Sequence, residues 1–337
     1  MSLEAVWFFL WGLLWAVFFM TDGFDFGVGA LYPFLGKSDE DRRIMINTLG
    51  PLWDGNEVWL VTAGGVTFAA FPLVYATMFS SLYSILMLIL FALILRGVSF
   101  EFRGKIAHPG WKRVWDAAIF IGSLAPALLF GVVFANIFMG LPFDEDGYYG
   151  SLAALFNPYG LLGGFLFLAL FLQHGATWLC LKTAGELQAR AQRAANTIWY
   201  VLLCLAVVFL VVSWPATELY ANYLARPVLW LVVAGAVAAL LAVKFFVKKQ
   251  RWLPAWICSG VTIGLCTFFG LIGLFPNLFP SSMGSQYHLT AYNAASSPLT
   301  LKIMLGVVLV VIPVVIAYQA WAYFLFAGKV TADDLEY

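Results

Sequence analysis

Runs of about 20 apolar residues, separated by short polar segments, recur along the whole chain. Because the hydrocarbon core of a bilayer takes about 20 residues of helix to cross, each run predicts one transmembrane helix. The second run is the shortest, since Phe71-Pro72 discourages helix at its end, and Arg96 closes the third. The nine runs cover roughly residues 5–26, 56–73, 76–95, 117–140, 158–181, 194–213, 228–244, 252–275 and 303–327. We therefore expect an all-α polytopic integral membrane protein, with a single transmembrane domain over residues 1–337.

Basic residues fall almost entirely in alternate loops. With nine helices and the N-terminus outside, 16 of the 18 Lys and Arg lie on the inner side, and only Arg226 and Lys302 lie on the outer side. Cytoplasmic loops retain Lys and Arg during insertion. The pattern therefore predicts an N-terminus outside and a C-terminus in the cytoplasm. Leaving out any one helix would place basic loops on both sides.

Composition agrees with lipid as the main solvent. Of the 337 residues, 63% are hydrophobic and 11% are charged, against about 45–50% and about 25% in soluble domains. Lys plus Arg equals Asp plus Glu at 18 each, so the charge indicates no nucleic-acid partner. The four cysteines lie inside apolar runs and are expected to be structural. The first run lacks a basic start and a cleavage site, so we expect it to be a retained helix.

Carboxylates at helical spacing are the main candidates for chemistry. Asp22 and Asp25 lie three residues apart in the first run, and Asp54 and Glu57 lie three apart at the start of the second, with Asn56 beside them. Residues three apart share one face of a helix. Ionisable groups inside a membrane span are costly unless they are paired or hydrated, so each marks a possible functional site.

Two structural explanations compete with a functional one. Asp22 and Asp25 would lie among lipid headgroups if the first helix ended near them, although the apolar pattern resumes directly as FGVGALYPFL. Asp54 and Glu57 would suit the N-terminus of the second helix. If the four carboxylates are buried together on the cytoplasmic side, they favour either a proton-conducting path or a cation site.

His174, in LFLQHGATW, is the remaining polar residue within a span. A buried heme bound by His174 would need a second axial ligand that faces it. His108 and His288 cannot supply that ligand, because they lie in loops on opposite sides. A hydrogen-bonded packing histidine is therefore the favoured interpretation. The sequence shows no pairing of a nucleophile with a base, no catalytic residue and no metal site. The residues therefore predict a proton- or ion-handling membrane subunit. A proton-coupled membrane transporter is the alternative, although we find no inverted repeat of the kind common in transporters.

Ordered motifs along nearly the whole sequence resemble subunit II of the cytochrome bd quinol oxidases. They are TDGFDFGVG, RRIMINTLGPLWDGNEVWLVTAGG, FAAFPLVYA, FEFRGK, WDAAIFIGSLAPALLFGVVFAN, HGATWLCLKTAGEL and LFPNLFPSS. The resemblance implies a terminal oxidase of the bacterial cytoplasmic membrane. Subunit I of such an oxidase carries hemes b and d, oxidises quinol and reduces oxygen to water. This chain would be its heme-free partner, with a structural quinone and small single-helix accessory subunits as further expected components.

The resemblance also implies roles for particular residues. Acidic residues of subunit II are thought to supply protons from the cytoplasm, and Asp25 and Asp54 occupy those motif positions, with Asp22 and Glu57 as companions. Other positions fall in segments that the family associates with the subunit interface, assembly and heme insertion; they are Trp53, Asn56 and Arg96. A third hypothesis keeps the carboxylates as a purely structural scaffold for heterodimer assembly.

Overall fold

The computed structural model describes residues 2–335, which form a bundle of long helices. The helices of this range are α1 (Leu3–Leu35), α2 (Asp39–Asn47), α3 (Trp53–Ala70), α4 (Pro72–Ser81), α5 (Tyr83–Phe102), α6 (Pro109–Met139), α7 (Pro158–Lys182), α8 (Gly185–Ala216), α9 (Ala221–Ala225), α10 (Trp230–Lys248), α11 (Trp252–Leu274) and α12 (Pro298–Leu325). Two short strands, β1 (Asn277–Phe279) and β2 (Leu289–Thr290), pair antiparallel in the loop before α12. The expected all-α fold is confirmed, apart from this hairpin.

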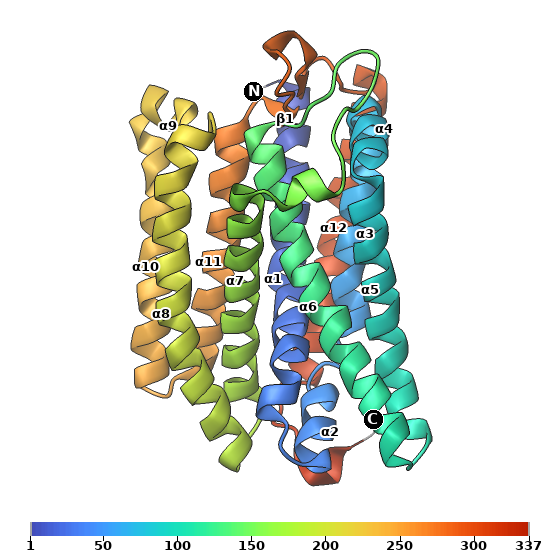
Figure 1. The fold of residues 1–337 in the computed structure, drawn as a ribbon, viewed down its shortest axis with the longest axis vertical. Coiled ribbons are helices and arrows are strands. Elements are labelled where there is room, and N and C mark those ends of the chain that lie inside the picture. Colours follow the sequence, from blue (N-terminus) through green and yellow to red (C-terminus); the bar gives the residue numbers. More distant parts are fainter. Residues whose placement is uncertain (1, 336–337) are drawn as a thin grey trace.

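Eight helices of the described chain are long and apolar enough to cross a membrane. They are α1, α5, α6, α7, α8, α10, α11 and α12. The predicted second span corresponds to α3, which has 18 residues but opens with the polar sequence WDGNE. The two chain ends lie at opposite ends of the bundle (Figure 1). The number nine and the direction of insertion stay predictions.

Several predicted helix boundaries differ from the structure, and two of these differences matter for the site. The first helix does not end near residue 26, because the apolar residues after Asp25 continue it to Leu35. The third helix does not end at Arg96, because α5 begins only at Tyr83 and runs to Phe102, so Arg96 lies within it. A buried arginine was mistaken for a helix end, since the sequence does not reveal the carboxylates that pair with it.

The helix α1 passes through the middle of the bundle, between α3, α6, α7 and α11 (Figure 1). Glycines allow its backbone to approach α7 closely. A Cβ at Gly27 would overlap the carbonyl oxygen of Phe171 and lie 2.9 Å from the Cα of Gly175. The aromatic side chains Phe18, Phe19 and others of α1 are buried around this contact. The centre of the bundle is therefore fixed by close packing on α1.

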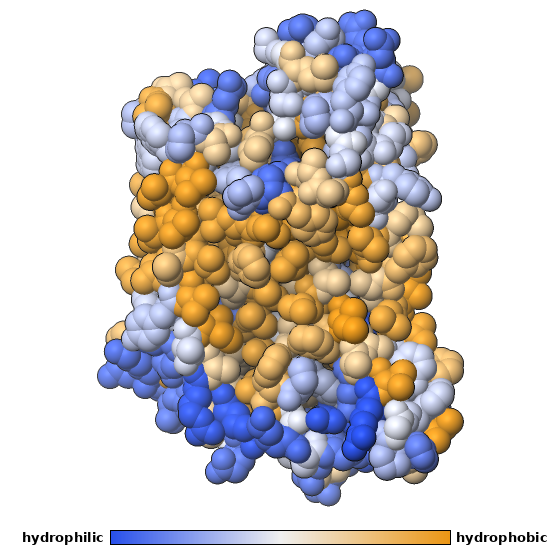
Figure 2. Space-filling model, viewed as in Figure 1, coloured by the Kyte–Doolittle hydropathy of each residue, from blue (hydrophilic) through white to orange (hydrophobic). Residues whose placement is uncertain are grey.

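On the face that Figure 2 shows, the surface of the bundle is apolar in its middle and polar at both ends. Helices α8, α10 and α12 bury little of their most apolar stretches, only 22%, 11% and 6% respectively. Large aliphatic side chains such as Val310 and Val314 are exposed there. Such a band suits lipid or a membrane partner. The end of the bundle that holds α2 and the C-terminal segment also carries the α5–α6 loop (Figure 1).

Candidate functional site

A buried ion-pair cluster joins α1, α3 and α5. The Nη2 atom of Arg96 lies 2.9 and 3.1 Å from the two carboxylate oxygens of Asp22, and 2.5 Å from Oε1 of Glu57. The side chains of Arg96 and Asp22 are fully buried, whereas 23% of the Glu57 side chain is exposed. The guanidinium also lies over the ring of Phe26, with its carbon 4.5 Å from the ring centroid. Arg96 is thus held by charge on one side and by an aromatic face on the other.

Asp25, one turn from Asp22 on α1, is linked to α3 and α12 by hydrogen bonds. The Nδ2 group of Asn56 donates to Oδ2 of Asp25 over 2.8 Å. The hydroxyl of Tyr323 donates to Oδ1 of Asn56, also over 2.8 Å. Asp25 is fully buried, and its Oδ1 atom has no partner among the residues that the structure describes. That oxygen is free to accept a proton or a hydrogen bond from a bound molecule.

The local sequence accounts for the shape of the cluster. Asp22 and Asp25 share one face of α1, as their spacing predicts. The helix α3 begins at Trp53 with Leu52 as its N-cap, and no side chain caps it by a hydrogen bond. The capping explanation for the carboxylates of α3 is therefore wrong for Glu57, which pairs with Arg96.

Asp54 does not join the buried cluster. It lies in the first turn of α3, and its side chain is exposed on this chain. The neighbouring Trp53 ring packs 5.7 Å from the ring of Phe100 and contacts the position of Gly97, next to Arg96. Of the predicted site residues, the structure brings Asp22, Asp25, Asn56, Glu57 and Arg96 together, places Trp53 beside them and leaves Asp54 on the surface.

Helix α12 contributes residues that the sequence analysis did not single out. Besides Tyr323, it supplies Gln319, whose Nε2 donates to the carbonyl of Gly55 and whose Oε1 accepts from the indole of Trp59. A glutamine inside an apolar run was the available signal. These bonds tie α12 to the start of α3, next to the carboxylates.

His174 is a fully engaged packing residue. Its Nε2 lies 2.9 Å from the carbonyl oxygen of Met20, so this nitrogen carries the proton, and its Nδ1 lies 2.5 Å from the hydroxyl of Ser259. The ring stacks on Trp256 at an angle of 4°. Heme ligation through either nitrogen would break one of these bonds. In residues 2–335, no three His, Cys, Asp or Glu side chains gather as a metal ion would require.

The three carboxyl groups of the cluster face a single guanidinium. Asp22, Asp25 and Glu57 outnumber Arg96, so the cluster can take up a proton without gaining a net positive charge. Unpaired charge in a low-dielectric interior is costly. The arrangement is therefore suited to holding and releasing a proton inside the membrane.

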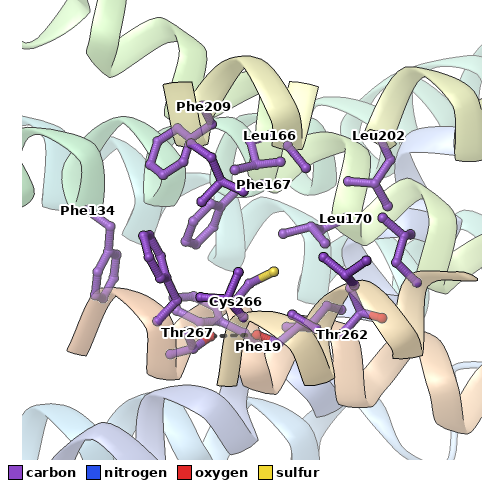
Figure 3. A pocket seen from close by; sticks show the side chains of 18 of the residues that line it. Phe19, Phe134, Leu166, Phe167, Leu170, Leu202, Phe209, Thr262, Cys266 and Thr267 are labelled. Carbon is purple, nitrogen blue, oxygen red and sulfur yellow. Dashed lines mark hydrogen bonds between the residues drawn. The ribbon is translucent and has the colours of Figure 1, made fainter. Parts of the chain in front are cut away.

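A separate apolar hollow lies between α1, α6, α7, α8, α10 and α11 (Figure 3). Phenylalanines, among them Phe167 and Phe209, form much of its wall. The hydroxyls of Thr262 and Thr267 donate to carbonyls of their own helix. The lining fits a hydrocarbon tail, but these hydroxyls are not free to bind the carbonyl oxygens of a quinone ring.

Comparisons with known proteins agree on one family. The family model described as "Cytochrome bd terminal oxidase subunit II" matches residues 3–326. The chain is 38% identical to the Cytochrome bd-I ubiquinol oxidase subunit 2 of Escherichia coli (strain K12), over 99% of this chain and 97% of that protein. It is 40% identical to the Cytochrome bd ubiquinol oxidase subunit 2 of Bacillus subtilis (strain 168), over 99% and 98%.

A solved structure shows the same fold. A chain in the structure of bd oxidase from Geobacillus thermodenitrificans superposes with a TM-score of 0.75, covering 97% of this chain and 99% of that chain. At a sequence identity of 18%, this likeness shows the fold alone. The family match over the whole helical bundle shows that the chain belongs to the cytochrome bd terminal oxidase subunit II family, as a multi-pass subunit of a respiratory oxidase in the bacterial inner membrane.

Proposed function

We propose that this chain is the heme-free subunit of a quinol:oxygen oxidoreductase, and that its buried carboxylates supply cytoplasmic protons for the reduction of oxygen to water. In this proposal subunit I binds hemes b and d and oxidises quinol. The observation that carries the proton role is the buried cluster of Asp22, Asp25 and Glu57 with Arg96, inside a mostly apolar bundle. A scaffold needs no more carboxyl groups than its arginine can pair, whereas Asp25 makes no direct bond to Arg96 and keeps one free oxygen.

The cluster has the parts that proton transfer requires. Arg96 holds Asp22 and Glu57 in place, and Asn56 with Tyr323 fixes the orientation of Asp25. The free Oδ1 atom of Asp25 is the acceptor site. A carboxyl group that is positioned and partly unpaired can pick up a proton and pass it on without moving its backbone.

Subunit I is expected to cover the face formed by α3, α5 and α12. Glu57 of α3 reaches Arg96 of α5, and Gly55 of α3 binds Gln319 of α12, so the three helices are adjacent. Asp54 and part of Glu57 are exposed on this apolar face. A carboxylate against lipid is expensive. We infer that protein, not lipid, lies over Asp54 and that this residue passes protons at the interface.

The basic end of the bundle is proposed to face the cytoplasm. It contains α2, the α5–α6 loop and the C-terminal segment, which together hold many of the Lys and Arg residues. Positive loops remain on the cytoplasmic side. This orientation places the N-terminus outside, and it opens the route to Asp25 from the cytoplasm.

Replacing Asp25 with asparagine in the assembled oxidase is expected to slow proton-coupled turnover roughly 10²-fold or more, because the amide cannot carry the proton. Asp54→Asn is expected to slow it in the same direction. The measurement is oxygen consumption with added quinol and cytoplasmic proton uptake in proteoliposomes, after the heme spectrum has shown normal assembly.

Asp146→Asn, in the exposed outer loop, is the matched control and should leave the rate unchanged. Wild-type turnover and membrane potential in Asp25→Asn would show that the cluster carries no protons. Loss of heme from both Asp25→Asn and Asp54→Asn would instead favour the structural scaffold.

A further inference from the structure

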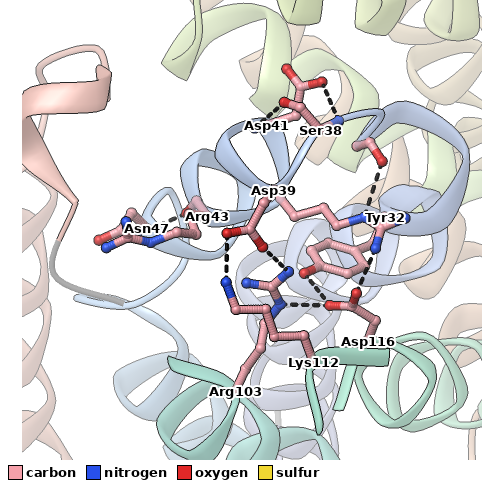
Figure 4. Close-up of polar contacts among 11 residues, drawn as sticks. Tyr32, Ser38, Asp39, Asp41, Arg43, Asn47, Arg103, Lys112 and Asp116 are labelled. Carbon is pink, nitrogen blue, oxygen red and sulfur yellow. Dashed lines mark hydrogen bonds and ion pairs between the residues drawn. The ribbon is translucent and has the colours of Figure 1, made fainter. Parts of the chain in front are cut away.

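A second polar cluster lies at the basic end of the bundle, centred on Asp116 of α6 (Figure 4). Its carboxylate accepts from the hydroxyl of Tyr32 over 2.7 Å, from Nη1 of Arg42 over 2.6 Å and from Nε of Arg103 over 2.5 Å. Only 12% of the Asp116 side chain is exposed, and 3% of the Arg103 side chain. The cluster thus joins α1, α2, α6 and the 3-10 turn Arg103–Lys105, which follows α5.

The Asp116 cluster borders the surface at the basic end of the bundle. Two surface hollows are lined in part by Asp116, one beside Tyr32 and one beside Asp39. Asp39 accepts from Arg103 over 2.8 Å and from Lys112 over 2.7 Å. Partial burial opposes ionisation of Asp39, but these two cations outweigh it and lower the pKa of its carboxyl below the ordinary value. Ionised groups in contact with solvent therefore surround the outer side of Asp116.

From Asp116, buried polar positions continue inward along α6 and α1. Ser123 lies seven residues beyond Asp116, which is two turns or about 10 Å of helix. It contacts α1 at Gly29, where a Cβ would overlap its hydroxyl. Gly29 lies one turn from Tyr32 and one turn from Asp25. Ser123 is therefore halfway between the outer cluster and the buried carboxylates.

Helix α5 and the turn that follows it carry a further row of polar residues, beside those of α6 and α1. Arg96, Ser99 and Arg103 follow the spacing i, i+3 and i+7, and all three are buried. A Cβ at Gly122 of α6 would come within 2.9 Å of the Cβ of Arg96. Gly122 and Ser123 lie on the same turn of α6, so α6 meets α5 at Arg96 and α1 at Gly29 at the same depth of the bundle. We call Tyr32, Ser99, Arg103, Asp116 and Ser123 the polar seam; it ends at Arg96.

Several atoms along this line lack a partner among residues 2–335. They are Oγ of Ser123, Nε and Nη1 of Arg96, and Oδ1 of Asp25. Buried polar atoms are nearly always hydrogen-bonded, to protein or to water. Buried waters typically join such groups over two to four bonds. The unpartnered atoms belong to α1, α5 and α6, the three helices that meet at this depth of the bundle.

We propose that the polar seam binds a chain of water molecules that carries protons from Asp116 at the cytoplasmic end, past Ser123, to Arg96 and the buried carboxylates. The route runs through the interior of this subunit and is distinct from entry at Asp54 on the interface. It rests on the proposed function of the carboxylate cluster. Asp116 is the entrance group, and Ser123 is a positioning residue that orients water in the narrowest part.

A purely structural role explains only half of these observations. Ion pairs to Arg42 and Arg103 suit a clamp that holds α2 and α5 against α6. A clamp gives no reason for a buried serine hydroxyl without a partner two turns deeper, nor for the two free nitrogens of Arg96. Their position between two carboxylate groups is what a hydrated path needs.

The matched substitutions Ser123→Val and Ser123→Thr test the seam in the complete oxidase. The two side chains have nearly the same shape, but only threonine keeps the hydroxyl. Cytoplasmic proton uptake is measured with a pH dye during a single turnover, in preparations with normal heme spectra and unfolding midpoints. Ser123→Val should slow uptake roughly tenfold or more relative to Ser123→Thr. Equal rates in the two variants would overturn the proposal.

Asp116→Asn gives the second measurement, with Asp116→Glu as its control. The asparagine variant should slow uptake, and the glutamate variant should restore at least part of it. If neither Ser123 variant assembles, this pair decides the question, and wild-type uptake in Asp116→Asn rejects the seam. Ser213→Ala, a buried serine of α8 outside the seam, should have no effect on uptake.

The result for Asp25→Asn separates the two proposals. Slow uptake in Asp25→Asn with normal uptake in Ser123→Val and Asp116→Asn would reject the seam and keep the carboxylate cluster as the proton carrier, entered from Asp54. Normal uptake in Asp25→Asn would reject the proposed function itself.

Discussion

Replacing Arg96 with methionine is expected to destabilise the subunit by roughly 3–5 kcal/mol, because it leaves buried carboxylates without a counter-charge. Asp22 and Glu57 both rely on its Nη2 group. A loss of this size is a large part of the stability of a typical domain. The amount of assembled complex in membranes and the midpoint of its thermal unfolding measure the effect.

If uncompensated charge causes the loss of stability in Arg96→Met, removing the carboxylates should restore the stability. Combining Arg96→Met with Asp22→Asn and Glu57→Gln removes the uncompensated charges and should recover much of the assembled complex, although without proton transfer through Asp22. Arg113→Met is the control, because Arg113 is exposed at the basic end. An unfolding midpoint of Arg96→Met that matches this control would show that the buried ion pairs contribute little.

The substitution Gly27→Ala is expected to have the second largest effect. Its added methyl group would overlap the backbone of α7 at Phe171 and crowd Gly175. Backbone atoms cannot turn aside as a flexible side chain can, so α1 and α7 must separate, at a cost of roughly 1–3 kcal/mol or more. Because Asp25 lies two residues before Gly27, the shift should also slow turnover. Thermal unfolding and oxygen consumption of the purified oxidase check both effects.

Gly235→Ala is the matched control for this substitution. At that position on α10 an added Cβ meets only the end of the Leu265 side chain, at 3.2 Å. Alanine also favours helix over glycine by about 1 kcal/mol, so the stability should change little or increase. Equal losses in Gly27→Ala and Gly235→Ala would mean that backbone approach is not what glycine provides in α1.

The sequence motifs named most of the residues that the structure brings together in the buried cluster. The spacing of Asp22 and Asp25 predicts one helical face, and the structure buries both on α1. The capping explanation for Glu57 failed because a helix start in the sequence cannot show that an arginine of another helix lies opposite. Arg96 was placed at the end of a helix for the same reason, since hydropathy counts a charged residue as polar whether or not it is paired.

Hydrophobic periodicity and charge placement determined by themselves that this chain spans a membrane with many helices, because lipid demands about 20 apolar residues for each crossing. The motifs determined the family. Only the tertiary structure decided which polar groups meet. It brought Arg96 to Asp22 and Glu57, it joined Asn56 to Tyr323, 267 residues further along the chain, and it left Asp54 on the surface. The physical reason is that the hydropathy of a sequence measures how apolar each helix is, whereas the partners of its few polar groups depend on how the helices pack.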